Sequence, residues 1–311
     1  MPAWKANPAN KELVKALRKN RPDAGVYSWD RTARLYKVFD ALGEPFVHVP
    51  WHPWEQILWE NCAYLVDDSW REGQLEALSR QIGLDPKKIL RARRDRLRRV
   101  LSFTGTRILD QRVDKIRTCA ELCLRDFGGD VLGTVMPLAP QAALKALMKF
   151  PGIGVPSAER ILLFMGHDLY VPMDSNAMRL ALRLGYGTPK KSYDATYRAV
   201  QQALKREARP THRWLTELWE KLRYHGQEVC TRTPRCEECV LWNLCPWYKA
   251  RWGRKEPEVF RWARKMIARD EKYPPPPPAP PPPPEPAPAP LTGKRKGKGK
   301  GKRERAPFIP F

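Results

Sequence analysis

The sequence predicts an all-α fold followed by a disordered C-terminal tail. From about Leu13 to Lys272, apolar residues recur at spacings of three and four, which is the period of a helix with one buried face. Glycine or proline marks short breaks between these segments, and no segment alternates apolar and polar residues as a half-buried strand would. The 311 residues are enough to bury a large core in one or two domains.

The breaks divide this region into a series of amphipathic segments, each bounded where the apolar spacing starts and stops. In chain order, we expect helices at Leu13–Lys19, Trp29–Leu42, Trp54–Val66, Trp70–Ile82, Asp85–Leu101, Asp110–Phe127, Pro140–Lys149, Ser157–Met165, Ser175–Leu184, Ser192–Glu207, Arg213–His225 and Pro257–Ala268.

The composition changes abruptly after the last of these segments. The stretch Pro274–Pro290 is almost entirely proline and alanine, which predicts an extended polyproline II segment of roughly 50 Å at ~3.1 Å per residue. A glycine-interleaved basic run follows at Lys294–Arg303. The tail is therefore expected to be disordered, and it serves either as a second nucleic-acid contact or as a solubilising extension.

Charge and cysteine usage narrow the class of protein. The net charge of +23, from 57 Lys+Arg against 34 Asp+Glu, indicates a polyanionic partner such as nucleic acid or an acidic membrane surface. Met1–Asn20 has no apolar signal core and no stretch has the ~18 apolar residues of a membrane span, so we expect a soluble protein of the cytoplasm, associated with the nucleoid. Seven cysteines in such a chain favour metal ligation over a disulfide framework.

A tight turn between two helical segments is the first candidate binding element. Gly152 and Gly154, separated by Ile153, allow a turn that a β-carbon would prevent. They also leave backbone N–H groups bare at the start of the second helix, which is a natural phosphate site. Pro156 suits the first turn of that helix. An ordinary corner between two helices is the alternative.

This segment resembles the Leu-Pro-Gly-Val-Gly hairpin of the helix-hairpin-helix DNA glycosylases, the superfamily that includes endonuclease III and the adenine mismatch glycosylases. The resemblance extends from about Pro53 to Pro246 and implies that Gly152, Ile153 and Gly154 bind DNA. In that superfamily a catalytic aspartate stands just downstream of the hairpin, at the start of the next helix. Asp174 occupies this place.

Two departures from endonuclease III bear on the mechanism that the resemblance implies. Bifunctional members carry a lysine nucleophile two residues after the second hairpin glycine, where this sequence has Pro156. Asp174-Ser175-Asn176 is also more similar to the Asp-x-Asn of monofunctional mismatch glycosylases than to the Asp-Thr-His of endonuclease III. Both features favour hydrolysis without a Schiff base.

The second motif is a cluster of four cysteines, Cys230, Cys236, Cys239 and Cys245, with the spacing C-x5-C-x2-C-x5-C. Four thiolates this close can ligate an iron–sulfur cubane or a structural zinc ion. His225-Gly226 before the first cysteine resembles the superfamily's approach to a 4Fe-4S cluster, although the first loop is one residue shorter. The resemblance implies that this loop presents Arg232 and Arg235 to the DNA backbone.

The remaining thiols, Cys62, Cys119 and Cys123, fall on apolar helix faces, where we expect buried core residues. A dense arginine run extends from Arg91 to Arg99 and offers either a phosphate-contacting face or a simple solvated helix.

The early helix that starts near Pro53 contributes a second candidate carboxylate. Counting from this proline, Glu60 falls where the adenine mismatch glycosylases carry their catalytic glutamate. Its neighbours Trp59 and Cys62 are apolar, so we expect desolvation to raise its pKa and make it a proton donor to the leaving base. The alternative is a salt-bridged surface glutamate. Tyr64 is predicted either to fill the stack left by a flipped nucleotide or to belong to the core.

The resemblance implies two helical lobes with a DNA-binding cleft between them. Residues 50–168 form a six-helix barrel lobe, and residues 169–252 form the cluster lobe together with N-terminal helices from 1–49; a C-terminal helix (253–272) and the tail (273–311) follow. The implied function is that of a monomeric base-excision-repair glycosylase acting on double-stranded DNA. A bifunctional glycosylase/AP lyase and a non-catalytic DNA-structure binder are the alternatives, and the excised base stays open.

Overall fold

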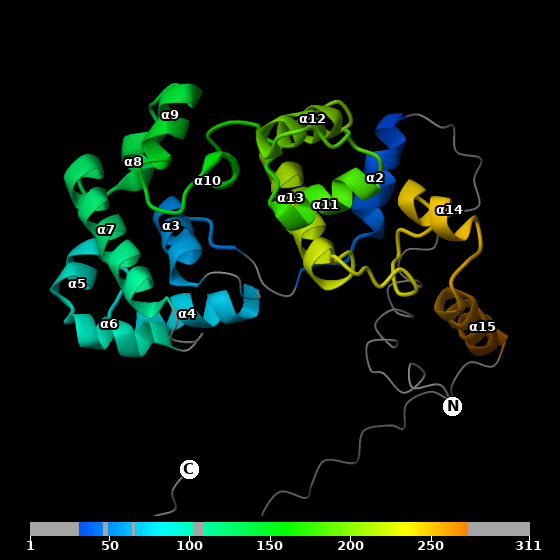
Figure 1. The fold of residues 1–311 in the computed structure, drawn as a ribbon, viewed down its shortest axis with the longest axis horizontal. Helices are drawn as coiled ribbons and strands as arrows, with labels where there is room; N and C mark the ends of the chain where they lie inside the picture. Colours follow the sequence, from blue (N-terminus) through cyan, green and yellow to red (C-terminus); the bar gives the residue numbers. More distant parts are fainter. Residues whose placement is uncertain (1–30, 46–48, 64–65, 67, 103–107, 273–311) are drawn as a thin grey trace, which may run out of the picture.

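The computed structural model describes residues 31–45, 49–63, 66, 68–102 and 108–272, and these residues form helices and loops without a strand (Figure 1). The predicted helix at residues 13–19, Tyr64 and the Pro-rich basic tail lie outside the described residues. Within the described part, no helix combines the length and the apolar composition needed to cross a bilayer.

The helices occur in the following order: α2 (Arg31–Ala41), α3 (Pro53–Cys62), α4 (Asp68–Gln81), α5 (Pro86–Arg91), α6 (Arg94–Leu101), α7 (Leu109–Phe127), α8 (Val131–Val135), α9 (Pro140–Leu147), α10 (Val155–Phe164), α11 (Ser175–Arg183), α12 (Tyr193–Lys205), α13 (His212–Glu228), α14 (Pro246–Trp252) and α15 (Glu258–Lys272).

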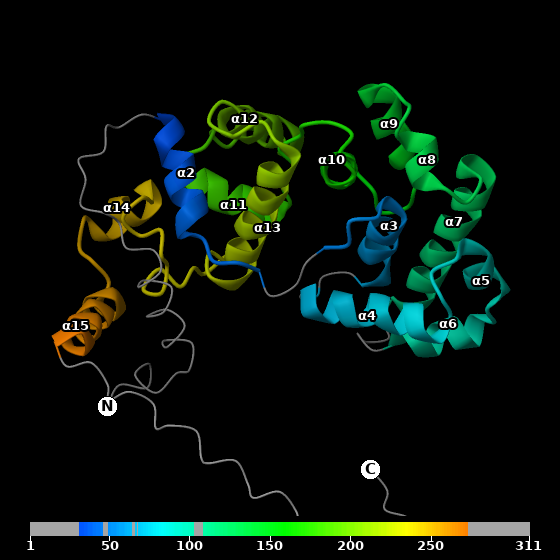
Figure 2. The ribbon, with the colours of Figure 1, turned by 180° about the vertical axis from the view of Figure 1, so that it is seen from behind.

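In space these helices gather into two groups (Figures 1 and 2). In the first group α3, α5, α6 and α8 pack against the long helix α7, and the fully buried Ile57, Val113 and Ile116 lie in its core. In the second group α11 packs against α12 and α13. Helix α10 contacts α3 and α9 on one side and α13 on the other, so it lies between the groups. The boundaries expected for the lobes stay a prediction.

Helix α2, the first among the described residues, belongs to the second group, although α3 is the next helix in the sequence. Tyr36 and Phe39 place their rings 5.3 and 4.9 Å from that of Trp214 on α13. The Arg34 guanidinium donates to the carbonyl of Leu184 at the end of α11. These contacts explain how an early segment supports a part of the chain that comes more than a hundred residues later.

One predicted helix is wrong. The range Asp85–Leu101 consists of two helices, because Ala92 and Arg93 adopt extended backbone angles with ψ of 133° and 141°. Arg117 from α7 donates to the carbonyls of Leu90 and Ala92, both at 3.2 Å, and so stabilises the end of α5. The short helices α8 and α14 were not predicted, since five and seven residues are too few to display a clear apolar period.

Several side chains of the arginine run donate hydrogen bonds to carboxylates and carbonyls of neighbouring helices. Arg94 donates to Asp110 and Asp114 on α7, and Arg98 also donates to Asp110. Arg96 donates to a backbone carbonyl of the neighbouring α4. For Arg94, Arg96 and Arg98 these contacts favour the solvated-face interpretation over a phosphate-contacting one; for the other arginines of the run, Arg91, Arg93 and Arg99, both interpretations stay predictions.

Candidate functional site

The predicted hairpin is present as the turn between α9 and α10. Gly152 has φ +74°, the left-handed region that favours glycine, and the Ile153 N–H donates to the Phe150 carbonyl at 3.2 Å. Gly154 precedes α10 as its N-cap residue without a side-chain cap hydrogen bond, and a proline stands in the first turn, as expected for Pro156. The N–H groups at the start of α10 therefore have no side-chain acceptor of their own, and such a helix start suits an external phosphate.

A residue that the sequence analysis did not single out supports this turn. The Asn61 side chain donates to the carbonyls of Ile57 and Pro151, both at 2.9 Å, so α3 is joined to the hairpin. A β-carbon on Gly152 would lie 3.1 Å from Asn61 Oδ1, which leaves little space for any larger residue. Glycine at this position is thus required both by its backbone angle and by the close approach of Asn61.

Asp174 stands at the start of the next helix, as the sequence predicts. Its Oδ1 accepts from the backbone N–H groups of Asn176 at 3.0 Å and Ala177 at 2.8 Å, so the carboxylate caps α11. Its Oδ2 accepts from the Asn176 amide at 3.3 Å and from the guanidinium of Arg223 on α13. The Asp174 side chain is 22% exposed, so the carboxylate is oriented on several sides and still reached by solvent.

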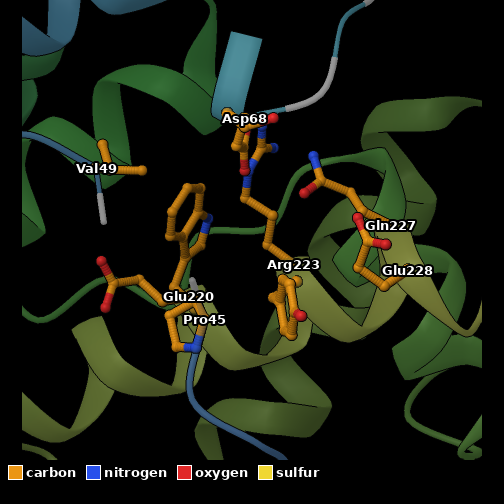
Figure 3. A pocket seen from close by; sticks show the side chains of 10 residues that line it. Pro45, Val49, Asp68, Glu220, Arg223, Gln227 and Glu228 are labelled. Carbon is orange, nitrogen blue, oxygen red and sulfur yellow. The ribbon is translucent and has the colours of Figure 1, made fainter. Parts of the chain in front are cut away.

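Arg223 connects Asp174 to the other group of helices. Its Nε donates to Asp68 Oδ2 at 3.0 Å and its Nη2 to Asp68 Oδ1 at 2.7 Å. This is a bidentate salt bridge with the first residue of α4. Arg223 and Asp68 line a cavity of about 220 Å³ together with Gln227 and Trp219 (Figure 3). Sequence reasoning missed both residues; a charged Arg223 beside the apolar Leu222 on the buried face of α13 was the available signal.

Glu60 lies in the same charged region, but with a protonation state opposite to the expected one. It accepts from Arg71 at 3.0 Å and from Arg160, whose side chain is 3% exposed. Burial alone raises the pKa of this carboxyl, yet Arg160 and Arg71, with a smaller contribution from Arg223, lower it from 4.5 to about 2. The expectation of a raised pKa was wrong because it considered the apolar neighbours and not the arginines that the fold brings in from α4 and α10.

The site therefore combines three carboxylates with three guanidinium groups from five elements. Its acidic members are Glu60, Asp68 and Asp174, and its basic members are Arg71, Arg160 and Arg223. The formal charges of the six side chains sum to zero. Among the described residues bonded to the three carboxylates, no lysine is present. We call these six residues the charged network.

The four cysteines of the second motif line one cavity, which also has apolar walls from Leu180, Leu241 and Trp242. In the described part of the chain, no three metal-ligating side chains are close enough to hold a single metal ion. Four thiols around one cavity provide the ligand set of a 4Fe-4S cluster, and also that of a four-cysteine zinc site.

Hydrogen-bond donors around these thiols also fit an anionic cluster. Arg183 donates to the sulfur of Cys230 at 3.2 Å. Burial raises the pKa of Cys245, while backbone N–H groups of Tyr248 and Trp247 act in the opposite direction by donating toward its sulfur. Donors of this kind stabilise thiolates and the sulfur ligands of clusters. The chemistry of the cavity thus fits the group that the sequence motif predicts.

The loop between the first two cysteines exposes both of its arginines, and their contacts differ. Arg232 is exposed, while its carbonyl accepts from Arg183 at 3.1 Å. Arg235 is about half exposed and pairs with Glu238 at 3.3 Å. Both lie on the surface, as a DNA contact requires. The other thiols, Cys62, Cys119 and Cys123, are fully buried, which confirms that they are core residues.

Comparison with other sequences finds endonuclease III proteins and a transcriptional activator. The chain is 24% identical to endonuclease III of Thermotoga maritima over 170 residues, which are 53% of this chain and 70% of that protein. It is 35% identical to endonuclease III of Treponema pallidum over 107 residues, 32% of this chain and 44% of that protein. The match to the transcriptional activator DEMETER of Arabidopsis thaliana is 27% identical over 144 residues, and it spans 42% of this chain but only 7% of that protein. No family model matches the chain.

Comparison with solved structures finds the same group. An endonuclease III trapped as a covalent intermediate with DNA superposes with a TM-score of 0.53 at 19% identity, over 71% of this chain and 94% of that one. A thermostable thymine-DNA glycosylase superposes with a TM-score of 0.52 at 15% identity, over 79% of this chain and 99% of that one. At such identities the likeness shows a shared fold.

Proposed function

This chain is a homologue of the helix-hairpin-helix DNA glycosylases of the endonuclease III family, and on that premise we propose that it removes a damaged or mismatched base from duplex DNA by hydrolysing the N-glycosidic bond. One observation carries the proposal. Asp174 is a carboxylate with 22% of its side chain exposed, oriented by four hydrogen-bond donors, at the start of the helix that follows the glycine hairpin.

The chemistry of base removal explains what this carboxylate does. Cleavage of the glycosidic bond develops positive charge on the sugar, so a carboxylate beneath the ring stabilises the transition state and orients the attacking water. The target nucleotide leaves the helical stack before it can reach such a group. We assign the sugar-facing role to Asp174, since its two oxygens are already directed by α11 and Arg223 and need no rearrangement.

The described partners of the site's carboxylates favour a monofunctional enzyme, because they include no lysine amine. A lyase reaction requires a nucleophilic amine that forms a Schiff base with the sugar. Pro156 stands at the position where bifunctional members carry their lysine, and the described partners of the charged network's carboxylates are arginines and backbone or amide groups. Arginine stays protonated at physiological pH and does not serve as this nucleophile.

DNA binding follows from the hairpin and from the overall charge. The open N-terminus of α10, reached through Gly152, Ile153 and Gly154, is proposed to hold a backbone phosphate, and the net charge of +23 attracts the duplex. Arg232 and Arg235 are proposed as further phosphate contacts on the cysteine loop. The insertion role of Tyr64 stays a prediction, because this residue lies outside the described part.

Glu60 enters the proposal as an anion and not as a proton donor. With a pKa near 2, it is ionised throughout the physiological range and holds Arg71 and Arg160 in place. In this proposal the base leaves as an anion that then takes a proton from water, or it is protonated by water as the bond breaks.

We also propose that Cys230, Cys236, Cys239 and Cys245 hold a 4Fe-4S cluster. When bound, the cluster would supply a structural cross-link within the segment between α13 and α14, which carries all four cysteines. Arg183 on α11 already donates to Cys230 and to the loop carbonyls of Thr231 and Arg232, so the chain's own contacts support the same geometry. This cross-link would keep Arg232 and Arg235 on one surface.

The test is base release from a panel of duplexes, each with one defined lesion or mismatch, assayed for abasic product with and without alkali. We expect abasic product that is cleaved only after alkali, and no covalent adduct with borohydride. A trapped adduct would indicate the bifunctional alternative. Asp174→Asn should abolish base release. Asp114→Asn should not, because it removes an exposed carboxylate of α7 that pairs with Arg94 of α6. Retention of full activity in Asp174→Asn contradicts the proposal.

A further inference from the structure

Arg223 places a positive charge directly against the carboxylate that the proposed reaction needs as an anion. Its Nη1 donates to Asp174 Oδ2, and only 9% of its side chain is exposed. A cation at this place opposes the positive charge that develops on a sugar above Asp174, because both charges act across a poorly solvated space. The site can work only if the guanidinium charge is compensated.

Asp68 is placed to provide this compensation. Its carboxylate accepts from the other two guanidinium nitrogens, Nε at 3.0 Å and Nη2 at 2.7 Å, and its own side chain is 16% exposed. The Gln227 amide lies beside the same pair; with its oxygen toward Arg223, it accepts from Nη2 at 3.2 Å and donates to Asp68 Oδ2 at 3.0 Å (Figure 3). Asp68 therefore has its oxygens directed at Arg223 and is not a loose surface charge.

Asp68, Asp174 and Arg223 come from three separate helices, so their contacts join distant parts of the chain. Asp68 is the first residue of α4, Asp174 caps α11 and Arg223 lies in α13. The pair Asp68–Arg223 thus spans 155 positions in the sequence and joins the two groups of helices beside the proposed sugar site. The neutralisation of Arg223 beside Asp174 therefore depends on the first residue of α4 lying next to α13.

We propose that Asp68 and Arg223 are positioning residues that set the effective charge of Asp174: Arg223 orients Asp174 Oδ2, and Asp68 cancels the guanidinium charge so that Asp174 keeps its full attraction for the sugar cation. This inference rests on the proposed function, since it assigns the electrostatics of the same site. It makes a prediction that a purely structural salt bridge does not make.

The distinguishing variants are Asp68→Asn and the double variant Asp68→Asn with Arg223→Gln. Asp68→Asn keeps the shape of the side chain but leaves the Arg223 charge uncompensated. We expect its single-turnover rate of base release to fall by at least about tenfold, because a unit charge a few ångströms from the sugar raises the barrier. The Kd for DNA should stay equal or decrease, since one negative charge has been removed. The double variant, which removes both charges, should recover much of the rate.

Asp114→Asn is the matched control, because it makes the same substitution at another arginine-paired carboxylate, on α7. Thermal melting of all variants shows whether the fold is kept. If Asp68→Asn does not fold, the double variant carries the test: a rate within about tenfold of the wild type supports the proposal, and a rate as low as that of Asp174→Asn overturns it.

Two results for a folded Asp68→Asn overturn the inference: a rate equal to that of Asp114→Asn, or a double variant no faster than the single one. Both are distinct from failure of the proposed function. Wild-type protein without base release, or an active Asp174→Asn, contradicts the function itself, whereas an Asp174-dependent enzyme indifferent to Asp68 contradicts only the role of this pair.

Discussion

Replacing Glu60 by glutamine should destabilise the protein at neutral pH by about 3 kcal/mol. The magnitude follows from the carboxyl pKa, which falls from 4.5 to about 2 through Arg160 and Arg71. Each pKa unit corresponds to about 1.4 kcal/mol of preference for the charged form in the folded state. Only 19% of the Glu60 side chain is exposed, so screening by solvent is limited. Removal of one member of a buried pair has a cost of similar size, about 3 to 5 kcal/mol.

The sign of the pH dependence follows from linkage. A carboxyl whose pKa is lowered by folding contributes its full stability above its ordinary pKa of 4.5, and this contribution is lost as the pH falls toward about 2. Glutamine does not ionise. The difference in unfolding free energy between wild type and Glu60→Gln should therefore be constant above about pH 5 and shrink steadily below it.

Urea denaturation followed by tryptophan fluorescence, at several pH values between 7 and 3, measures this difference. Glu76→Gln is the control, because Glu76 pairs with Arg80 on the surface, with side chains 54% and 76% exposed. Exposed pairs of this kind contribute little, so the control should unfold at nearly the wild-type urea concentration. An equal stability difference at pH 3 and pH 7, or a Glu60→Gln variant as stable as the wild type, would refute the reasoning.

Three further outcomes are expected. Gly152→Ala should lower the free energy of unfolding by about 1 kcal/mol and weaken DNA binding, because it forces a β-carbon into a left-handed turn 3.1 Å from Asn61. Urea denaturation and titration with duplex DNA measure the two effects. An unchanged affinity for DNA would mean that the turn does not hold a phosphate. Gly226→Ala should lower the melting temperature more than Gly152→Ala does, since its β-carbon would lie 2.6 Å from the backbone oxygen of Asn176 and push α13 away from α11. Thermal melting measures the difference, and a Gly226→Ala variant as stable as Gly152→Ala would show that the two helices can shift. Cys245→Ala should lose bound iron and sulfide together with melting temperature, and full iron content would exclude this cysteine as a ligand.

Local patterns predicted most of the described helices and the hairpin, because these features depend on neighbours in the chain. The 3.6-residue period locates α7 and α13 within a few residues, and paired glycines predict the turn before α10. Asp174 was predicted from the resemblance, by its place after the hairpin, and the structure shows its carboxylate capping the first turn of α11. The break at Ala92 could not be predicted, because it depends on Arg117 reaching over from α7.

The charge state of the site depends on contacts between distant residues. Glu60 has apolar neighbours in the sequence, yet Arg160, 100 positions later, decides its pKa. In the same way, Arg223 and Asp68 meet across 155 positions. The sequence by itself determined most of the helices and the glycine turn, and its motifs singled out the four cysteines and Asp174. Only the tertiary structure decided which arginines face which carboxylates, because electrostatic energies depend on distances in space and on burial, and neither is set by residue order.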